Sequence, residues 1–241
     1  RIGLGNYKDL FGDKDFTKAL RNTSIYVVFV VPCSIALSLL IAVLLNSNIK
    51  CQGLFQTIFF LPYVTSVIAI GLVWSWIFNS NYGLLNIILS WFGIDKIQWL
   101  NKPKYALPSL IIFSVWKSMA FDILIFLAGL QTIPKDLYNA ARVDSTPRWR
   151  VFWKITVPGI APMISYAFIM GFISAFKVYN EVFSLWGGKA GPANSAITVV
   201  YYIYDKFYNS HNYGLASAAA VILFLIILVL TIVQRMMGRK K

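Results

Sequence analysis

Long uncharged apolar runs alternate with short polar segments along most of this chain. A helix needs about 20 apolar residues to cross the hydrocarbon core of a bilayer. Five runs reach that length, and the pattern therefore predicts five membrane-spanning helices. They lie at about 23–45, 54–78, 105–130, 158–185 and 214–233. A sixth apolar stretch, 84–92, is too short to span and is expected to lie in the interface or to pack on the bundle.

Only the sequence SNIKCQ separates the first two expected spans, which predicts a tight helical hairpin. The segment 131–157, between the third and fourth spans, is long, amphipathic and cationic. Pro134 favours a helix start, so a short helix is expected at 135–143. Ser145 and Thr146 are expected to cap a second short helix that begins at Pro147. Two short helices with a sharp break between them, held at a membrane surface, predict a docking site for another protein.

Each of these two short helices has a distinct face. On the first, the residues that fall on or near one face are small in the middle and polar at the end: Leu137, Ala140, Ala141 and Asp144. On the second, an apolar side suited to the membrane interface is expected from Trp149, Phe152, Trp153 and Val157.

The spacing within this loop resembles the EAA loop of the permease subunits of bacterial ABC importers. Asn139, Ala140 and Ala141 stand at the E-A-A positions, Ser145 at the glycine, and Ile155, Val157 and Pro158 at the I-x-L-P positions. Asn139 replaces the Glu, so it can hydrogen-bond to the ATPase but cannot form a salt bridge. Ser145 lacks the freedom of glycine at positive φ, so a tighter break or a shifted register is expected.

Further segments resemble the carbohydrate-uptake branch of that family, the branch of maltose and glycerol-3-phosphate permeases. The sequences GGKAGPANS and YYIY are similar to signatures of the first of its two paired permeases. The tyrosines there could stack on a sugar or anchor the interface, and anchoring is the commoner use. The sequences GNYKDLF and KALRNT resemble the segment that follows the first span in this family, so a further span is expected upstream of residue 1.

The resemblance implies an all-α polytopic bundle of the type I ABC importer permease class, in the bacterial cytoplasmic membrane. Residues 1–22 would be extracytoplasmic, and 23–241 would form the permease domain with its coupling loop at 131–157. The implied partners are a second permease, two ATPase subunits that use ATP and Mg²⁺, a solute-binding protein and a sugar. The residues implied in ATPase contact are Leu137, Asn139, Ala140, Ala141, Asp144, Ser145, Pro147 and Pro158.

The third and fourth spans each present a face of polar or small residues, and these faces are the candidates for a translocation path, because charges at bilayer depth usually face a bundle interior or water. On the third span they are Ser114, Lys117, Ser118 and Phe121, at helical spacing, with Asp122 beside them. On the fourth they are Gly171, Ser174, Ala175 and Val178. The alternative is structural: Lys177 and Glu181 pair at i, i+4, and Lys117 snorkels to the interface.

Composition and charge support a membrane protein and exclude other classes. Apolar residues make up 58% of the chain, above the 45–50% or so of soluble domains. The net charge of +13 lies in loops and at the C-terminus, which indicates membrane flanks and not nucleic-acid binding. If 131–157 is cytoplasmic, inner and outer segments each hold ten basic residues, but the inner ones are denser.

The sequence offers no catalytic or metal chemistry. Cys33, Cys51 and the single histidine, His211, form neither a metal-ligand pattern nor a nucleophile with its base. The chain has no G-x-x-x-x-G-K-[ST] phosphate loop, so it would not itself hydrolyse ATP by that route. The main alternative function is a secondary transporter that couples ions through Lys117, Asp122 and Glu181, although the chain shows no internal repeat.

Overall fold

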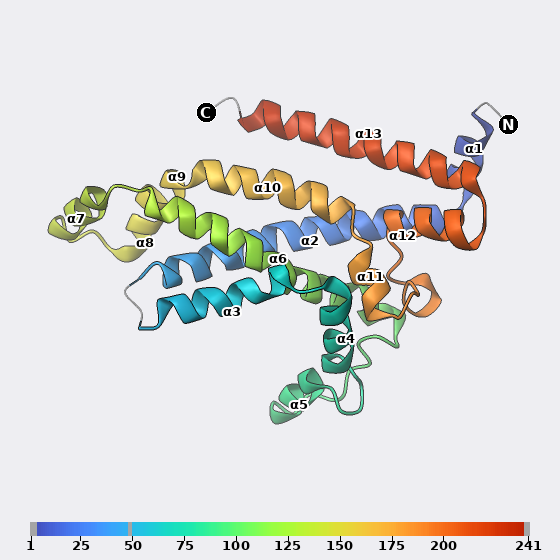
Figure 1. Cartoon of the computed structure of the whole chain (residues 1–241), viewed down its shortest axis with the longest axis horizontal. Coiled ribbons are helices and arrows are strands. Elements are labelled where there is room, and N and C mark those ends of the chain that lie inside the picture. The colour runs from blue at the N-terminus through green and yellow to red at the C-terminus, as the bar shows by residue number, and fades with distance from the viewer. Residues whose placement is uncertain (1–3, 48–49, 239–241) are drawn as a thin grey trace. The chain divides into compact units, whose positions relative to one another are not determined.

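The computed structural model describes residues 4–47 and 50–238, and its regular elements there are helices (Figure 1). The last three C-terminal cations, Arg239, Lys240 and Lys241, lie outside the described residues. The helices are α1 Gly5–Gly12, α2 Lys14–Leu45, α3 Gln52–Val64, α4 Val67–Ile77, α5 Leu84–Trp91, α6 Pro103–Gln131, α7 Lys135–Val143, α8 Arg148–Val151, α9 Val157–Gly159, α10 Ala161–Phe176, α11 Asn180–Leu185, α12 Val199–Tyr204 and α13 Tyr213–Gly238. Short π-helical turns follow α8 at Phe152–Thr156 and α12 at Asp205–Asn209, and a 3-10 turn forms at Pro192–Asn194.

Three helices, α2, α6 and α13, are long and apolar enough to cross a membrane, and they confirm the first, third and fifth expected spans. The start of α2 differs from the expectation, because the helix begins at Lys14. Asp13 caps it: the Asp15 N–H donates to Asp13 Oδ1 over 2.8 Å. The polar residues 14–22 therefore continue the first span as helix.

The second expected span, 54–78, is interrupted. Its residues form α3 and α4, which are separated at Thr65 and Ser66, and Ser66 has an extended backbone. Pro62 lies in the last turn of α3 and cannot donate the helical hydrogen bond to its preceding turn, which weakens the helix at that point. The run counts as a span only if the two helices are taken as one broken span.

The fourth expected span, 158–185, is also not one helix. The helical stretch Arg148–Gly159 bends by 68° into α10. The helix α10 ends at Phe176, and α11 begins only at Asn180 after a non-helical Tyr179. Thr198 Oγ1 donates to the Val178 carbonyl over 2.9 Å, so a tertiary contact satisfies a carbonyl in the non-helical link between α10 and α11.

The chain groups into two compact units. One comprises Arg1–Val30, Thr65–Ser114 and Phe172–Lys241, and the other comprises Val31–Val64 and Val115–Gly171. The core of the second unit is made by the ends of α2 and α6 with α10. Its buried residues are Leu39, Ala42, Leu45, Ile123, Phe126, Leu127, Leu130, Ile133, Ile160 and Ala167.

Buried Asn86 organises the short helix α5 in the first unit. Its side-chain amide donates to the carbonyls of Ser80 and Ile97, and its oxygen accepts from the Ile97 N–H and the Trp99 indole. These bonds tie α5 to the loop segments on either side of it. Trp91 and Phe92 at the end of α5 are about three-quarters exposed.

A close contact joins α4 and α11 in the same unit. Gly71 is buried, and a Cβ atom added there would collide with the Ser184 side chain. Glycine is therefore required at this position by packing, since its φ is ordinary for a helix.

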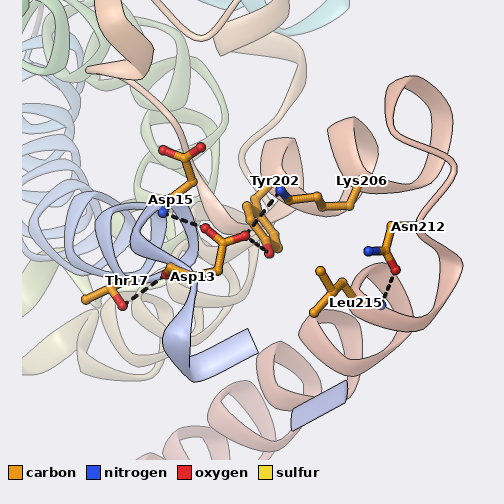
Figure 2. A network of polar contacts seen from close by, with 7 residues as sticks. All are labelled: Asp13, Asp15, Thr17, Tyr202, Lys206, Asn212 and Leu215. Atoms are coloured by element: carbon orange, nitrogen blue, oxygen red, sulfur yellow. Dashed lines mark hydrogen bonds and ion pairs between the residues drawn. The ribbon is translucent and has the colours of Figure 1, made fainter. Parts of the chain in front are cut away.

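A polar network connects the N-terminus of α2 to α12 and the turn after it. Figure 2 shows Tyr202 and Lys206 both reaching the carboxylate of Asp13 from the same side. Tyr202 donates its hydroxyl to Asp13 Oδ2 over 2.8 Å, and Lys206 Nζ lies 3.1 Å from the same oxygen. Partial burial acts to raise the pKa of Asp13, but the hydrogen bonds from Tyr202, the Asp15 N–H and Lys206, with the lysine charge, outweigh it and lower that pKa.

Candidate functional site

The loop between α6 and α10 has the architecture that its sequence predicts. The helix α7 occupies Lys135–Val143, and α8 follows after a break, next to it in Figure 1. The break has a defined geometry: Ser145 is left-handed, with φ of 51°. Its N–H donates to the Arg142 carbonyl over 3.1 Å, and the Thr146 N–H donates to the Ala141 carbonyl over 2.9 Å.

This pair of hydrogen bonds is a Schellman motif, in which the residue after the helix cap takes a left-handed backbone. Ser145 stands at the position that resembles the family's glycine, and it adopts the conformation that glycine favours. The serine accepts this conformation at a local cost of about 1–2 kcal/mol relative to glycine.

The inward side of this loop packs against other residues of the second unit, to which the loop itself belongs. The Tyr138 hydroxyl and Thr156 Oγ1 share a hydrogen bond of 3.2 Å, which joins α7 to the π-helical turn. Ala141 is buried, at 7% exposure. Ala141 therefore packs against its own chain, although the sequence pattern placed it with the outward docking residues.

The outward side carries most of the other residues implied in ATPase contact. Those exposed are Leu137, Asn139, Ala140, Asp144, Ser145, Pro147 and Pro158. Val143 belongs with them, since it is 84% exposed at the end of α7. The sequence analysis missed Val143, and the signal that could have found it is its position three residues after Ala140, on the same helical face.

The second short helix differs from its expected start. The helix α8 begins at Arg148, its N-cap is Pro147, and no side chain caps it. The four residues expected to form one apolar side of this helix also fall into two environments. Phe152 and Val157 pack against the core of the second unit, while Trp149 and Trp153 are 65% and 62% exposed.

The candidate path residues of α6 lie in varied environments. Ser114 is buried near Tyr26, and Lys117 and Ser118 are half-buried. Phe121 stacks on Tyr63 with ring centroids 5.1 Å apart. Asp122 is 7% exposed and lies beside Ser34, so a hydroxyl accompanies this carboxyl inside the second unit.

The candidates of the fourth span are not all on one helix. Gly171 is half-buried, Ser174 is exposed and Ala175 is buried on α10, but Val178 lies beyond the end of that helix. Lys177 lies in the turn after α10, and Glu181 lies in the first turn of α11. The i, i+4 relation expected for this pair does not exist, because the helix is broken between them.

The expected tyrosine-rich segment is partly internal. Tyr201 and Tyr202 are buried, and the Tyr201 hydroxyl donates to the Gly188 carbonyl over 2.7 Å. Tyr204 packs on Tyr179 with ring centroids 4.9 Å apart. Tyr208 packs on Tyr204 but is 61% exposed, so it is the most accessible of these four to an interface or a solute. His211 is exposed in a loop, as expected.

The loop 187–195 is held against the N-terminal part of α2. Lys18 Nζ donates to the Ala193 carbonyl over 2.7 Å, and the Asn22 amide donates to the carbonyls of Ser195 and Ile197, each over 3.0 Å. Thr23 Oγ1 accepts from the Val199 N–H. The sequence analysis missed Asn22 and Thr23, because short polar residues at the start of an apolar run give no signal of a distant partner.

Span-length helices and an exposed loop of two short helices indicate a helical membrane protein. The family described as "Binding-protein-dependent transport system inner membrane component" matches residues 34–241, and the chain belongs to this family. The arabinooligosaccharides transport system permease AraP of Halalkalibacterium halodurans is 35% identical over 97% of this chain and 74% of its own length. The trehalose/maltose transport system permease MalF of Thermococcus litoralis is 34% identical over 99% of this chain and 80% of its own length.

A solved structure has the same fold. A chain in the crystal structure of a bacterial alginate ABC transporter, in complex with an alginate pentasaccharide-bound periplasmic protein, superposes with a TM-score of 0.88. It is 26% identical, and the match covers 99% of this chain and 83% of that one. The expected all-α type I ABC importer permease fold is thereby confirmed.

Proposed function

We propose that this chain is a permease subunit that forms part of the path for a carbohydrate in an ATP-binding-cassette importer of the bacterial cytoplasmic membrane. Family membership supports the transport role. The transport systems named for arabinooligosaccharides, trehalose and maltose, and lactose support a carbohydrate as the solute. The single observation that supports the coupling role is the break after α7. Ser145 there adopts the left-handed conformation that ends α7 and lets α8 begin beside it.

The outward side of the loop, at 135–150, is the proposed ATPase contact. Leu137, Ala140 and Val143 lie at i, i+3 and i+6 and offer an exposed, largely apolar strip. Asn139 adds a neutral hydrogen-bonding group. Closure of the ATPase dimer would displace this loop, and the spans would then exchange inward-facing and outward-facing states.

The loop is suited to transmit such a displacement. The Tyr138–Thr156 hydrogen bond and the packing of Phe152 and Val157 on the core connect α7 to α6 and α10 within one compact unit. A packed core moves as a body and does not absorb the displacement. The loop and the inner half of α6 would therefore move together.

The proposed partners are those that the family description and the resemblance imply: a second permease, two ATPases and a solute-binding protein. ATP and Mg²⁺ would be bound by the ATPases. The alginate transporter was crystallised in complex with a periplasmic protein that holds the oligosaccharide, which supports the last of these partners.

The path itself is proposed to run along α6 and α10. Lys117 and Ser118 are half-buried and Ser174 is exposed, so these three polar side chains are accessible to a solute. Ser114, Asp122 and Ala175 are buried within the chain, which favours a supporting role. The ion-coupled secondary transporter is not favoured, because the family is one of binding-protein-dependent systems.

Affinity purification of the chain from its native membrane, in mild detergent, tests this function. We expect a second permease and a P-loop ATPase to be recovered with it. The binding protein of the same system can then be titrated with sugars to identify the solute. Recovery of the chain alone, under conditions in which related complexes survive, would contradict the proposal.

A further inference from the structure

A hollow of about 520 Å³ lies on the inward side of the α7 loop, within the second unit. Val43, Leu130 and Phe152 form its apolar part. Arg142 and Arg148, both exposed, are among the polar residues that line it. The volume falls in the range of about 300–1,000 Å³ that is typical of small-molecule sites.

The two arginines make this hollow suitable for an anion. Neither guanidinium has a carboxylate within salt-bridge distance among the residues that the structure describes. The segment 131–157 holds five basic residues against two acidic ones, a net charge of +3. A guanidinium presents a planar fork of N–H donors that matches phosphate oxygens and gives short, charge-assisted hydrogen bonds.

The position of the hollow indicates which anion it meets. Val43, Asn46 and Ser47 belong to the end of α2, and Leu130 belongs to the last turn of α6. Both helices are long and apolar enough to span, so their ends lie at the depth of the lipid headgroups. Trp149 and Trp153, which are neighbours in sequence of residues that line the hollow, are exposed, and tryptophan is typical of that interface.

An apolar strip leads from the hollow along α2. Ala36, Leu40 and Val43 follow helical spacing on one face, and Leu40 is 54% exposed one turn before Val43. A free phosphate or a sugar phosphate has no apolar part that could pack along such a strip. A lipid has an acyl chain that fits along it while its phosphate reaches the arginines.

We propose that this hollow binds the headgroup phosphodiester of an anionic phospholipid, in the leaflet on the side of the α7 loop. Arg142 at the end of α7 and Arg148 at the start of α8 hold the phosphate, and the acyl chains lie along α2. Basic pockets at the cytoplasmic ends of spans are suited to such headgroups. Because the two arginines flank the Ser145 break, the lipid bridges the two short helices of the proposed coupling loop.

The test is a lipid titration of the purified, delipidated importer complex, followed by native mass spectrometry. The probes are phosphatidylglycerol and phosphatidylcholine, with inorganic phosphate and glycerol 1-phosphate as competitors. The test variant is R142Q/R148Q. The matched control is R150Q/K154Q, which removes the same charge from the same segment at residues that do not line the hollow.

We expect one tightly held phosphatidylglycerol that phosphatidylcholine does not replace. R142Q/R148Q should lower its affinity at least about tenfold, and R150Q/K154Q should change it by less than about threefold. If R142Q/R148Q does not fold, R142K/R148K keeps the charge and removes the planar fork, and should still lose several-fold affinity.

Other outcomes overturn the proposal. Equal losses in both charge-removal variants would mean diffuse surface attraction, and no loss in either would mean that the hollow is not the site. Displacement by the small phosphates at lipid-like concentrations would assign the hollow to a soluble phosphate. Loss of the ATPase from R142Q/R148Q with unchanged phosphatidylglycerol binding would assign it to an ATPase carboxylate. Lipid binding is measured without turnover, so a failure of the transport proposal would be seen separately, as absent sugar-dependent ATP hydrolysis.

Discussion

At the scale of single residues, Ser145 shows how a position can keep a glycine conformation without glycine. Its φ of 51° closes the Schellman motif after α7, and the two backbone hydrogen bonds of that motif satisfy the carbonyls of Ala141 and Arg142. The hydrogen bonds offset the steric cost of a Cβ atom in the left-handed region.

Ser145→Gly should therefore stabilise the loop by about 1 kcal/mol and leave uptake intact, because it removes strain without changing the register. Ser145→Val should reduce both ATPase co-purification and uptake, since a β-branched residue is a genuine outlier at positive φ. Sugar uptake in cells and ATPase recovery measure both effects. Ser145→Asn is the control, because asparagine tolerates this conformation. A fully active Ser145→Val would show that the left-handed turn is dispensable.

Asp13 is the second informative residue, because it caps α2 and also binds Tyr202 and Lys206. Its pKa is lowered in the folded protein, so the unfolded chain takes up a proton at a higher pH than the folded one. The stability gained from the carboxylate is therefore complete above the ordinary pKa of about 4 and is lost as pH falls through the folded pKa.

Asp13→Asn should lower the thermal midpoint at pH 7, because asparagine keeps the cap but loses the charge that Lys206 binds. The difference from the natural protein should shrink as pH falls below about 4. Asp13→Ala should cost about 2 kcal/mol at pH 7, since it also removes the helix cap. Thermal unfolding in detergent at several pH values measures this. A pH-independent difference between the natural protein and Asp13→Asn would contradict the electrostatic account.

At the scale of elements, α7 has one side that packs against its own chain and another that is exposed for the proposed ATPase contact. Ala141 is buried against its own chain, while Ala140, one residue before it, is exposed. Neighbouring residues of the same type thus separate the effect on folding from the effect on docking.

Ala140→Asp should leave the thermal midpoint of the purified chain nearly unchanged and abolish ATPase recovery, because it places a charge on the proposed contact strip. Ala141→Asp should instead destabilise the chain itself by about 1–3 kcal/mol, because it places a larger, charged side chain at a buried position. Thermal unfolding and co-purification, measured on both variants, distinguish the two sides. The assignment fails if Ala140→Asp retains the ATPase and full uptake.

The contact between α4 and α11 makes a second prediction at this scale. Gly71→Ala should destabilise the protein by about 1–3 kcal/mol, since its new Cβ atom overlaps Ser184. Adding Ser184→Gly should recover much of that loss, because it removes the overlapping atoms. Thermal midpoints of the two single variants and the double variant measure the coupling. Simple additivity would show that the two residues do not meet.

At the scale of the whole molecule, the energy source of transport distinguishes the importer from an ion-coupled carrier. Uptake in cells should follow the ATP concentration and persist when an uncoupler collapses the proton gradient while ATP is maintained. The measurement is labelled-sugar uptake, with ATP and membrane potential recorded in parallel. Loss of uptake at constant ATP would favour ion coupling through Lys117, Asp122 and Glu181.

The sequence alone determined the helical class, three of the long spans and the limits of α7, because apolar length and proline position act locally. The resemblance carried by Asn139–Ala140–Ala141 and Pro158 also indicated the correct family. These features depend on neighbours along the chain, and a pattern can record them.

The tertiary structure decided the features that depend on distant partners. The Thr198 contact at Val178 accompanies the break within the fourth apolar run, and the contact with Thr156 fixes which side of α7 faces inward. Asn22 donates to the carbonyl of Ile197, which is distant in sequence, and Asn86 donates to the carbonyl of Ile97 in the loop that follows its helix. The length of an apolar run indicates that a segment prefers lipid or a protein core. It does not indicate which distant group will hydrogen-bond to a buried polar atom, and a helix can break only where such a partner is present.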